Sequence, residues 1–152
     1  GTNLFGISDS CTRSQAMMFI WRMAGKPEPY SWVKNPFSDI KPSHPHYKAV
    51  MWAYQNGVAK GFNDGTYGVD KPCTRGQIMT FIWRYAGQHK PKSNVSPFKD
   101  SITPAYRTAV LWGAELKITH GYSDGTYRDK ETCTRGQIVT FLYRIRNWAY
   151  KG

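Results

Sequence analysis

The sequence predicts an all-α protein made of tandem helix-loop-helix repeats. Residues 61–87 and 121–146 are close copies of each other and place Cys73 and Cys133 60 positions apart. Each copy also carries a helix start signal followed by apolar residues at helical spacing. Repetition at a fixed period of this size is typical of architectures in which each unit packs against its neighbours.

The first repeated element is a back half, in residues 1–25. From Phe5 to Gly25 the sequence matches the back half of the next copy at an offset of 62. Complete copies follow in residues 36–87 and 97–148. A chain of 152 residues is long enough to bury a core, so we expect the three units to form one compact domain.

Each complete copy opens with a front half that reads as a helix and a turn. A Phe-x-Asp motif precedes an apolar helix that contains Trp52 in one copy and Trp112 in the other. The segments 61–67 and 121–127 then read Gly-aromatic-x-Asp-Gly-Thr-Tyr, in which Asp-Gly is a strong turn signal. We expect a tight connection between two helices. A calcium loop is the alternative, although the alternating acids of an EF-hand loop are missing.

The back half of each copy begins with a capping box. A threonine at the N-cap and a glutamine three residues later can satisfy two N–H donors at the helix start. This pair occurs three times, as Thr12 with Gln15, Thr74 with Gln77 and Thr134 with Gln137. Apolar residues follow at i, i+3, i+4 and i+7, and an aromatic column lies off that stripe. We therefore expect these helices to be central ones, packed on more than one side.

A cysteine precedes each capping threonine, as Cys11, Cys73 and Cys133. This position favours a buried apolar residue that packs against the first helical turn. Two alternatives stay open: the three thiols could converge on a metal, or one could bond to another chain. No histidine recurs at a matching position, and zinc thiolate sites usually contain closely spaced cysteine pairs. The sequence predicts no cofactor.

An arginine follows each capping threonine, as Arg13, Arg75 and Arg135. The helix dipole disfavours a cation at this position, and the capping box does not require one. Its recurrence suggests another role: contact with an anionic ligand, or a salt bridge to an aspartate of a neighbouring repeat. Arg22, Arg84 and Arg144 also recur, near the helix C-termini, where a cation is stabilising.

The composition limits the classes of function. The net charge of +11 favours anionic partners, including nucleic acid, anionic lipid and acidic polysaccharide. No apolar stretch reaches the length of a membrane span, and no signal-peptide pattern is present, so we expect no membrane insertion. The four histidines show no repeated nucleophile, base or carboxylate pair around them, and the sequence therefore predicts that the chain is not an enzyme.

The ordered motifs resemble the S-layer homology repeat, a bacterial cell-wall anchoring family, from about residue 5 to residue 146. The resemblance implies a pseudo-threefold arrangement with a central helix bundle, and grooves between repeats that bind anionic, often pyruvylated, secondary cell-wall polysaccharide. It also implies an extracellular location on the cell wall or surface of a bacterium. The glycan-binding residues that it implies are Arg13, Arg75, Arg135, Asp39, Asp100, Trp52 and Trp112. Core packing is the alternative for both tryptophans.

Two features depart from the family pattern. Gln15, Gln77 and Gln137 stand where the family usually has glutamate, which makes the grooves more basic. The first repeat lacks its front half, so another chain is a candidate partner that completes it. Besides an anchoring module, the sequence allows a protein-interaction or structural scaffold without glycan binding. We do not expect nucleic-acid binding, because no recognised motif accompanies the charge.

Overall fold

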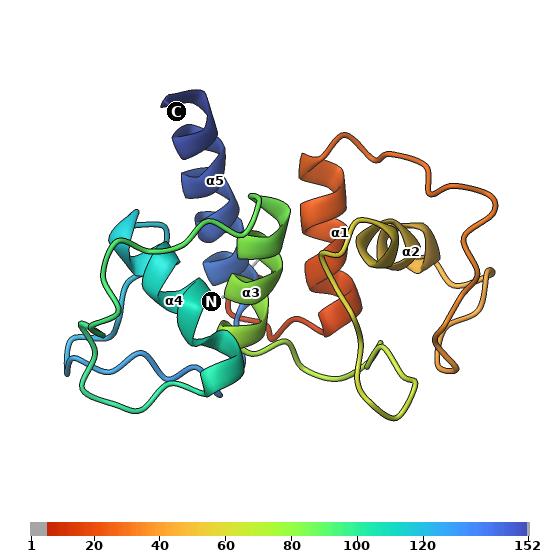
Figure 1. The fold of residues 1–152 in the computed structure, drawn as a ribbon. Helices are drawn as coiled ribbons and strands as arrows, with labels where there is room; N and C mark the ends of the chain where they lie inside the picture. Colours follow the sequence, from red (N-terminus) through yellow and green to blue (C-terminus); the bar gives the residue numbers. More distant parts are fainter. Residues whose placement is uncertain (1–5, 152) are drawn as a thin grey trace.

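The computed structural model describes residues 6–151, with side chains described through Trp148. In this range the chain forms helices and connecting loops (Figure 1), with strand pairing limited to isolated bridges. The helices, in chain order, are α1 (Arg13–Met23), α2 (Tyr47–Gln55), α3 (Arg75–Tyr85), α4 (Pro104–Glu115) and α5 (Arg135–Lys151). The predicted all-α class is confirmed.

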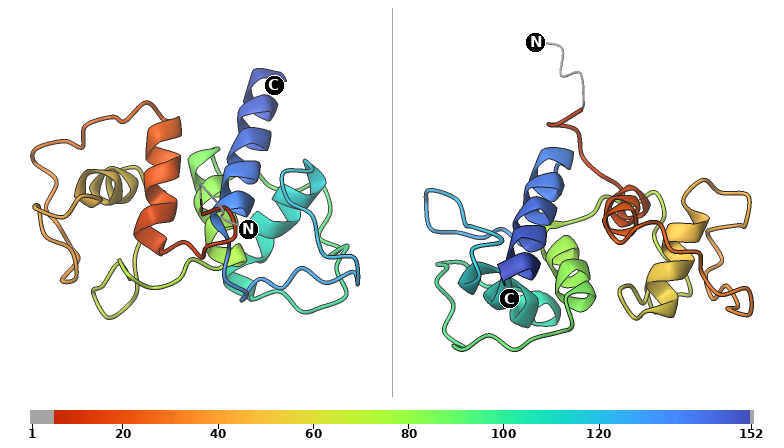
Figure 2. Two further views of the ribbon diagram at one scale, coloured as in Figure 1. Left: turned by 180° about the vertical axis from the view of Figure 1, so that it is seen from behind. Right: turned by 90° about the horizontal axis from the view of Figure 1, so that it is seen from above.

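The back-half helices form the centre of the molecule, and the front-half helices lie outside them. Helix α5 contacts both α1 and α3, while α2 packs against α1 and α4 packs against α3 (Figure 2). Each front half therefore lies against the central helix of the preceding repeat. This confirms the predicted central bundle, and it means that neighbouring repeats build each junction together.

The central helices begin at the predicted capping boxes. In α1 and α3 the N-cap threonine hydroxyl accepts the N–H of the glutamine, whose side chain accepts the threonine N–H. The same two bonds join Thr134 and Gln137 at the start of α5, at 3.0 and 3.2 Å. Glutamine therefore completes the capping box here, at the position where the family usually has glutamate.

The three helix starts meet at a ring of backbone hydrogen bonds. Cys11 N–H donates to the Cys133 carbonyl at 3.2 Å, Cys73 N–H to Cys11 at 2.8 Å, and Cys133 N–H to Cys73 at 2.8 Å. Because each bond joins two different repeats and the three bonds close on themselves, the ring marks a pseudo-threefold axis. The first helical N–H groups also donate across repeats: Arg13 to Lys71, Arg75 to Glu131 and Arg135 to Asp9.

The three thiols are buried at this ring. Cys11, Cys73 and Cys133 are each at most 1% exposed, and all are free. Burial raises the pKa of each thiol, that of Cys133 to about 12. Among the described residues, no group of three or more His, Cys, Asp or Glu side chains is arranged so that it could hold a metal ion. The cysteines lie in the core, as the staple position predicts.

The loops that follow α2 and α4 are tight turns held by aspartates. The Asp39 carboxylate accepts the N–H groups of Tyr67 and Gly68 at 2.8 Å and of Val69 at 3.0 Å. Asp100 accepts two of the equivalent N–H groups of repeat 3, those of Tyr127 and Arg128, each at 2.8 Å. Burial alone would raise the pKa of both carboxyls, but the N–H donors outweigh it and lower each pKa. The aspartates thus fix the loops through which one repeat contacts the next.

Candidate functional site

Arg13 and Arg75 tie each repeat to the loop of the next. The Arg13 Nε–H donates to the Tyr67 carbonyl at 2.8 Å. Arg75 donates to two carbonyls, from Nε to Tyr127 and from Nη2 to His120, both at 2.9 Å. The sequence suggested two roles for these arginines, contact with an anionic ligand or a salt bridge to an aspartate. In the structure both guanidinium groups donate to backbone carbonyls, which neither role predicted, and neither forms a salt bridge to an aspartate of the described residues.

Aromatic rings surround both buried guanidinium groups. Arg13 is 4% exposed and lies 4.5 Å from the ring centre of Phe62, with Tyr67 and Phe81 at 5.0 Å. Arg75, 3% exposed, lies 4.5 Å from the Tyr127 ring centre. Cation–π contacts of this kind partly offset the desolvation of a buried charge. The two cations are therefore built into the repeat junctions.

Arg135 occupies the same repeat position but has a different environment. It is only partly buried, and no front half of the described residues donates a loop to it. Its guanidinium lies beside the Cys11 thiol, where it opposes the effect of burial on the pKa of that thiol. It also borders the largest groove described below, so it is the most accessible of the three arginines that the sequence singled out.

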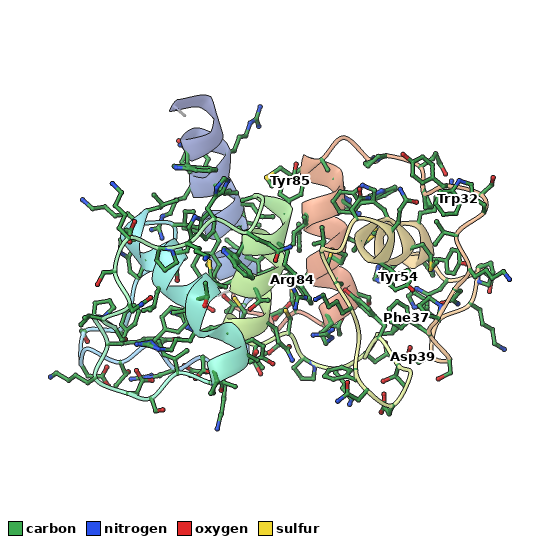
Figure 3. The ribbon with its side chains drawn as sticks, viewed as in Figure 1. Trp32, Phe37, Asp39, Tyr54, Arg84 and Tyr85 are labelled. Atoms are coloured by element: carbon green, nitrogen blue, oxygen red, sulfur yellow. The ribbon has the colours of Figure 1, made fainter. Side chains whose placement is uncertain are left out.

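A groove runs along the junction of α3 with the loop of its own repeat. Its volume is about 140 Å³, and Arg13 lies at its inner side. Arg84 borders it from α3, and Figure 3 places this side chain on the side of α3 that faces α1. The other contributors include Lys60, Phe62, Gln77 and Tyr106. The groove thus joins basic, amide and aromatic side chains from three repeats.

A related groove of about 430 Å³ lies on α5, one repeat further along. His120 stands there in the position of Lys60, and Arg144 in the position of Arg84. Gln137 and Phe141 repeat Gln77 and Phe81. The same kind of groove therefore recurs with the repeat, as expected if the repeats share one binding role.

The third groove, of about 780 Å³, separates α1 from α5. Gln15, Phe19 and Arg22 border it from α1, in the positions of Gln77, Phe81 and Arg84. His46 takes the place of Tyr106, and Arg135 takes the place of Arg13. This groove is larger than the other two, and no described residue in the position of Lys60 borders it.

The remaining residues that the sequence predicted lie away from these grooves. Trp52 and Trp112 are 6% and 2% exposed and belong to the core. Asp39 borders a separate hollow of about 340 Å³, and its carboxylate accepts hydrogen bonds from the loop N–H groups. Direct sugar contact by these residues and Asp100 stays a prediction.

Several side chains that border the grooves have no local sequence pattern that marks them as binding residues. Lys60 and His120 directly precede the Gly-aromatic turns, a shared position that could have identified them. Arg84 and Arg144 were noticed but interpreted through the helix dipole, whereas they also reach loop carbonyls, those of Val58 at 3.4 Å and Ile118 at 3.1 Å. Tyr106 enters from the next repeat, which no local pattern could indicate.

The fold defines a module of three related units with grooves at their junctions. The sequence matches the S-layer homology domain over residues 36–79 and 97–139, more than half of the chain. The chain therefore belongs to the S-layer homology family. No helix in the part that the structure describes is long and apolar enough to cross a membrane.

Three relatives show where this module occurs. A cell surface protein of Thermoanaerobacter kivui is 31% identical over 114 residues, covering 72% of this chain and 15% of the relative. Cell surface glycoprotein 1 of Acetivibrio thermocellus is 27% identical over 144 residues, covering 88% and 6%. A cellulosome-anchoring protein of the same organism is 25% identical over 148 residues, covering 93% and 33%. The chain thus spans a third or less of each relative.

Proposed function

We propose that the chain is a non-catalytic module that anchors a protein to the bacterial cell wall by binding anionic secondary cell-wall polysaccharide. One observation carries this proposal: the same basic and aromatic groove recurs at the junctions between repeats. The cell-surface and anchoring relatives support it. The module then acts outside the cell, at the bacterial wall or surface.

The chemistry of the groove suits an acidic sugar chain. Arg84 and Lys60 can bind a carboxylate such as a pyruvyl substituent, because guanidinium and ammonium groups form charge-assisted hydrogen bonds. The Gln77 amide can bond hydroxyl groups, and the Tyr106 ring offers a face to a sugar ring. Arg13, Arg75 and Arg135 add positive charge at the base of the junctions. The net charge of +11 favours the encounter with an anionic polymer.

Sedimentation with purified cell wall tests this function. We expect peptidoglycan that carries its polysaccharide to sediment the protein, and hydrofluoric-acid stripping of the polymer to abolish the effect. Lys60→Glu reverses a charge in the groove and should weaken binding at least tenfold. Lys41→Glu is the matched control, because Lys41 is exposed and borders none of the three grooves, and it should change binding little. Binding that survives stripping would refute the proposal.

A scaffold that only assembles or presents a surface is the second candidate. The observation that favours it is the engagement of Arg13 and Arg75 in contacts within the chain, which leaves them little capacity for a ligand. Lys60→Glu also separates the two functions. Under the scaffold hypothesis this variant leaves wall association unchanged, whereas under glycan binding it does not.

A further inference from the structure

Three aromatic side chains are exposed on the outer side of repeat 2. Trp32 is 74% exposed and Tyr30 is 57% exposed in the linker between α1 and α2, and Tyr54, near the end of α2, is 39% exposed. Figure 3 shows Trp32 and Tyr54 on the α2 side of the molecule, away from Arg84. None of these three rings borders the grooves described above. Exposed aromatic side chains gathered on one side of a protein mark an interaction surface.

The linker of repeat 3 has the same backbone anchor without these rings. In repeat 2 the Tyr30 N–H donates to the side-chain oxygen of Gln55 at 2.6 Å. In repeat 3 the Lys92 N–H donates to the Glu115 carboxylate at 2.8 Å, and both residues occupy the equivalent repeat positions. The two linkers are therefore tied to the outer helix of their repeat in the same way.

The side chains at the three aromatic positions differ between the two repeats. Repeat 3 has Lys92, Asn94 and Ala114 in the positions of Tyr30, Trp32 and Tyr54. Because repeat 3 ties its linker to its outer helix without aromatic side chains at these positions, holding the linker does not require the rings. They are available for a contact outside the chain.

The linker holds two of the rings in a fixed orientation. Tyr30 and Trp32 stack with their ring centres 5.2 Å apart and their planes at 10° to each other. The Val33 N–H donates to the Tyr30 carbonyl at 3.1 Å and closes a turn around the pair, and the Trp21 ring N–H holds the Pro27 carbonyl at 2.8 Å. Tyr30 supports one face of the Trp32 indole and leaves the other open. A ligand on that open face meets a ring that is already ordered, which lowers the entropy cost of binding.

The surroundings of the rings suit a sugar better than a protein partner. The CH-bearing face of a pyranose ring is apolar and packs on an aromatic ring, while the hydroxyl groups at its rim stay in contact with water or polar side chains. The linker is otherwise polar, with Glu28, Ser31 and Lys34 exposed. A stable protein interface buries about 800 Å² on each partner around an apolar core. Rings that alternate with exposed polar side chains offer flat platforms rather than such a core.

We propose that Tyr30, Trp32 and Tyr54 form a saccharide-binding surface, separate from the grooves, on which uncharged sugar rings of the wall polysaccharide stack. The inference rests on the proposed function, because it assigns to this surface further sugars of the polymer whose acidic groups the grooves bind. Trp32 is the main platform, supported by Tyr30, and Tyr54 adds a second ring. Stacking involves no charge on the sugar, so this contact depends little on salt, whereas ionic contacts in the grooves weaken as salt screens them.

Sedimentation isotherms on cell wall that carries its polysaccharide, measured at about 0.1 M and about 0.5 M sodium chloride, test this proposal. We expect Trp32→Ala to weaken binding about five- to tenfold at both salt concentrations. Trp32→Phe keeps a ring and should recover most of the loss. Lys60→Glu should lose most of its effect at the higher salt concentration. Asn94→Ala is the matched control, because Asn94 is exposed at the equivalent position of the other linker, and it should not change binding.

The outcomes distinguish this inference from the proposed function. If Trp32→Ala binds as tightly as the unsubstituted protein while Lys60→Glu binds weakly, the inference is wrong and the proposed function stands. A loss in Trp32→Ala that disappears at the higher salt concentration would also overturn the inference. An unsubstituted protein that does not sediment with the wall would overturn both. Binding that survives hydrofluoric-acid stripping but is lost in Trp32→Ala would overturn both as well, and would assign the rings to another component of the wall.

Discussion

At the scale of single residues, the three helix-start arginines show how position in the assembly changes the role of one side chain. Their repeat positions are the same, yet Arg75 is 3% exposed and bonded to two carbonyls, while Arg135 is partly exposed beside a groove. The difference arises because Arg75 has the loop of a following repeat to donate to. The unfavourable location at a helix N-terminus is thus offset by a contact with another repeat.

We predict a large difference in stability between two equivalent substitutions. Arg75→Ala removes two charge-assisted hydrogen bonds and the contact with the Tyr127 ring, so it should lower the free energy of unfolding by about 3 kcal/mol or more. Arg135→Ala should cost less than about 1 kcal/mol, because its side chain is partly exposed. Urea denaturation measures both. Equal costs would contradict a structural role for Arg75.

At the scale of elements, each central helix starts where its sequence specifies. The N-cap threonine and the glutamine bond each other in all three helices. The remaining N–H groups of the first turn depend on other repeats: Arg75 N–H reaches Glu131, and Gly76 N–H reaches Asp129 at 2.8 Å. A helix start here therefore combines a local signal with long-range acceptors.

Thr74→Ala tests the local part of this signal. The change removes the oxygen that accepts the Gln77 N–H at 3.2 Å, and we expect it to lower the free energy of unfolding by about 1 kcal/mol. Thr74→Ser keeps the hydroxyl and should recover most of that loss. Thermal and urea unfolding of the two variants provide the comparison. A serine variant as unstable as the alanine variant would show that the threonine methyl group, rather than the cap, matters.

At the scale of the whole molecule, the hydrogen bonds that the Asp39 and Asp100 carboxylates accept from the loops link stability to pH. The pKa of Asp39 and of Asp100 is lowered in the folded protein because N–H donors outweigh the effect of burial. Because each pKa is lower in the folded protein, these two carboxylates take up protons at a higher pH in the unfolded chain than in the folded one. The two ionised aspartates therefore contribute their full stabilisation above the usual aspartate pKa of about 3.9. This contribution is lost as the pH falls through the pKa values that they have in the folded protein.

Asp39→Asn should therefore weaken the acid dependence of stability. The amide has one oxygen acceptor in place of the two carboxylate oxygens that hold three N–H groups. We expect lower stability at neutral pH and a shallower loss between about pH 5 and pH 2. Asp70→Asn, at an exposed position, is the control and should leave the profile unchanged. An identical acid transition for Asp39→Asn and the unsubstituted protein would contradict this role.

The site was partly predictable at this scale. The sequence predicted that the junctions between repeats form the functional region, with Arg13, Arg75 and Arg135, and this stays a prediction. It did not identify the opposing side of each groove, because Lys60 and Tyr106 come from different repeats. Nor could it show that Trp52 and Trp112 face the core, since an aromatic side chain in an apolar helix suits either burial or ligand contact.

The sequence by itself determined the repeat, the all-α class and the starts of the central helices, because these depend on local spacing and on bonds between residues three apart. Only the tertiary structure decided which arginines are buried and which face of α5 is exposed. Both depend on the cyclic order of the repeats: α1 and α3 each pack against the front-half helix of the next repeat, and among the described residues α5 has no such partner. Equivalent residues of the three repeats are therefore buried to different extents, because contacts between repeats rather than local propensities determine how exposed each residue is.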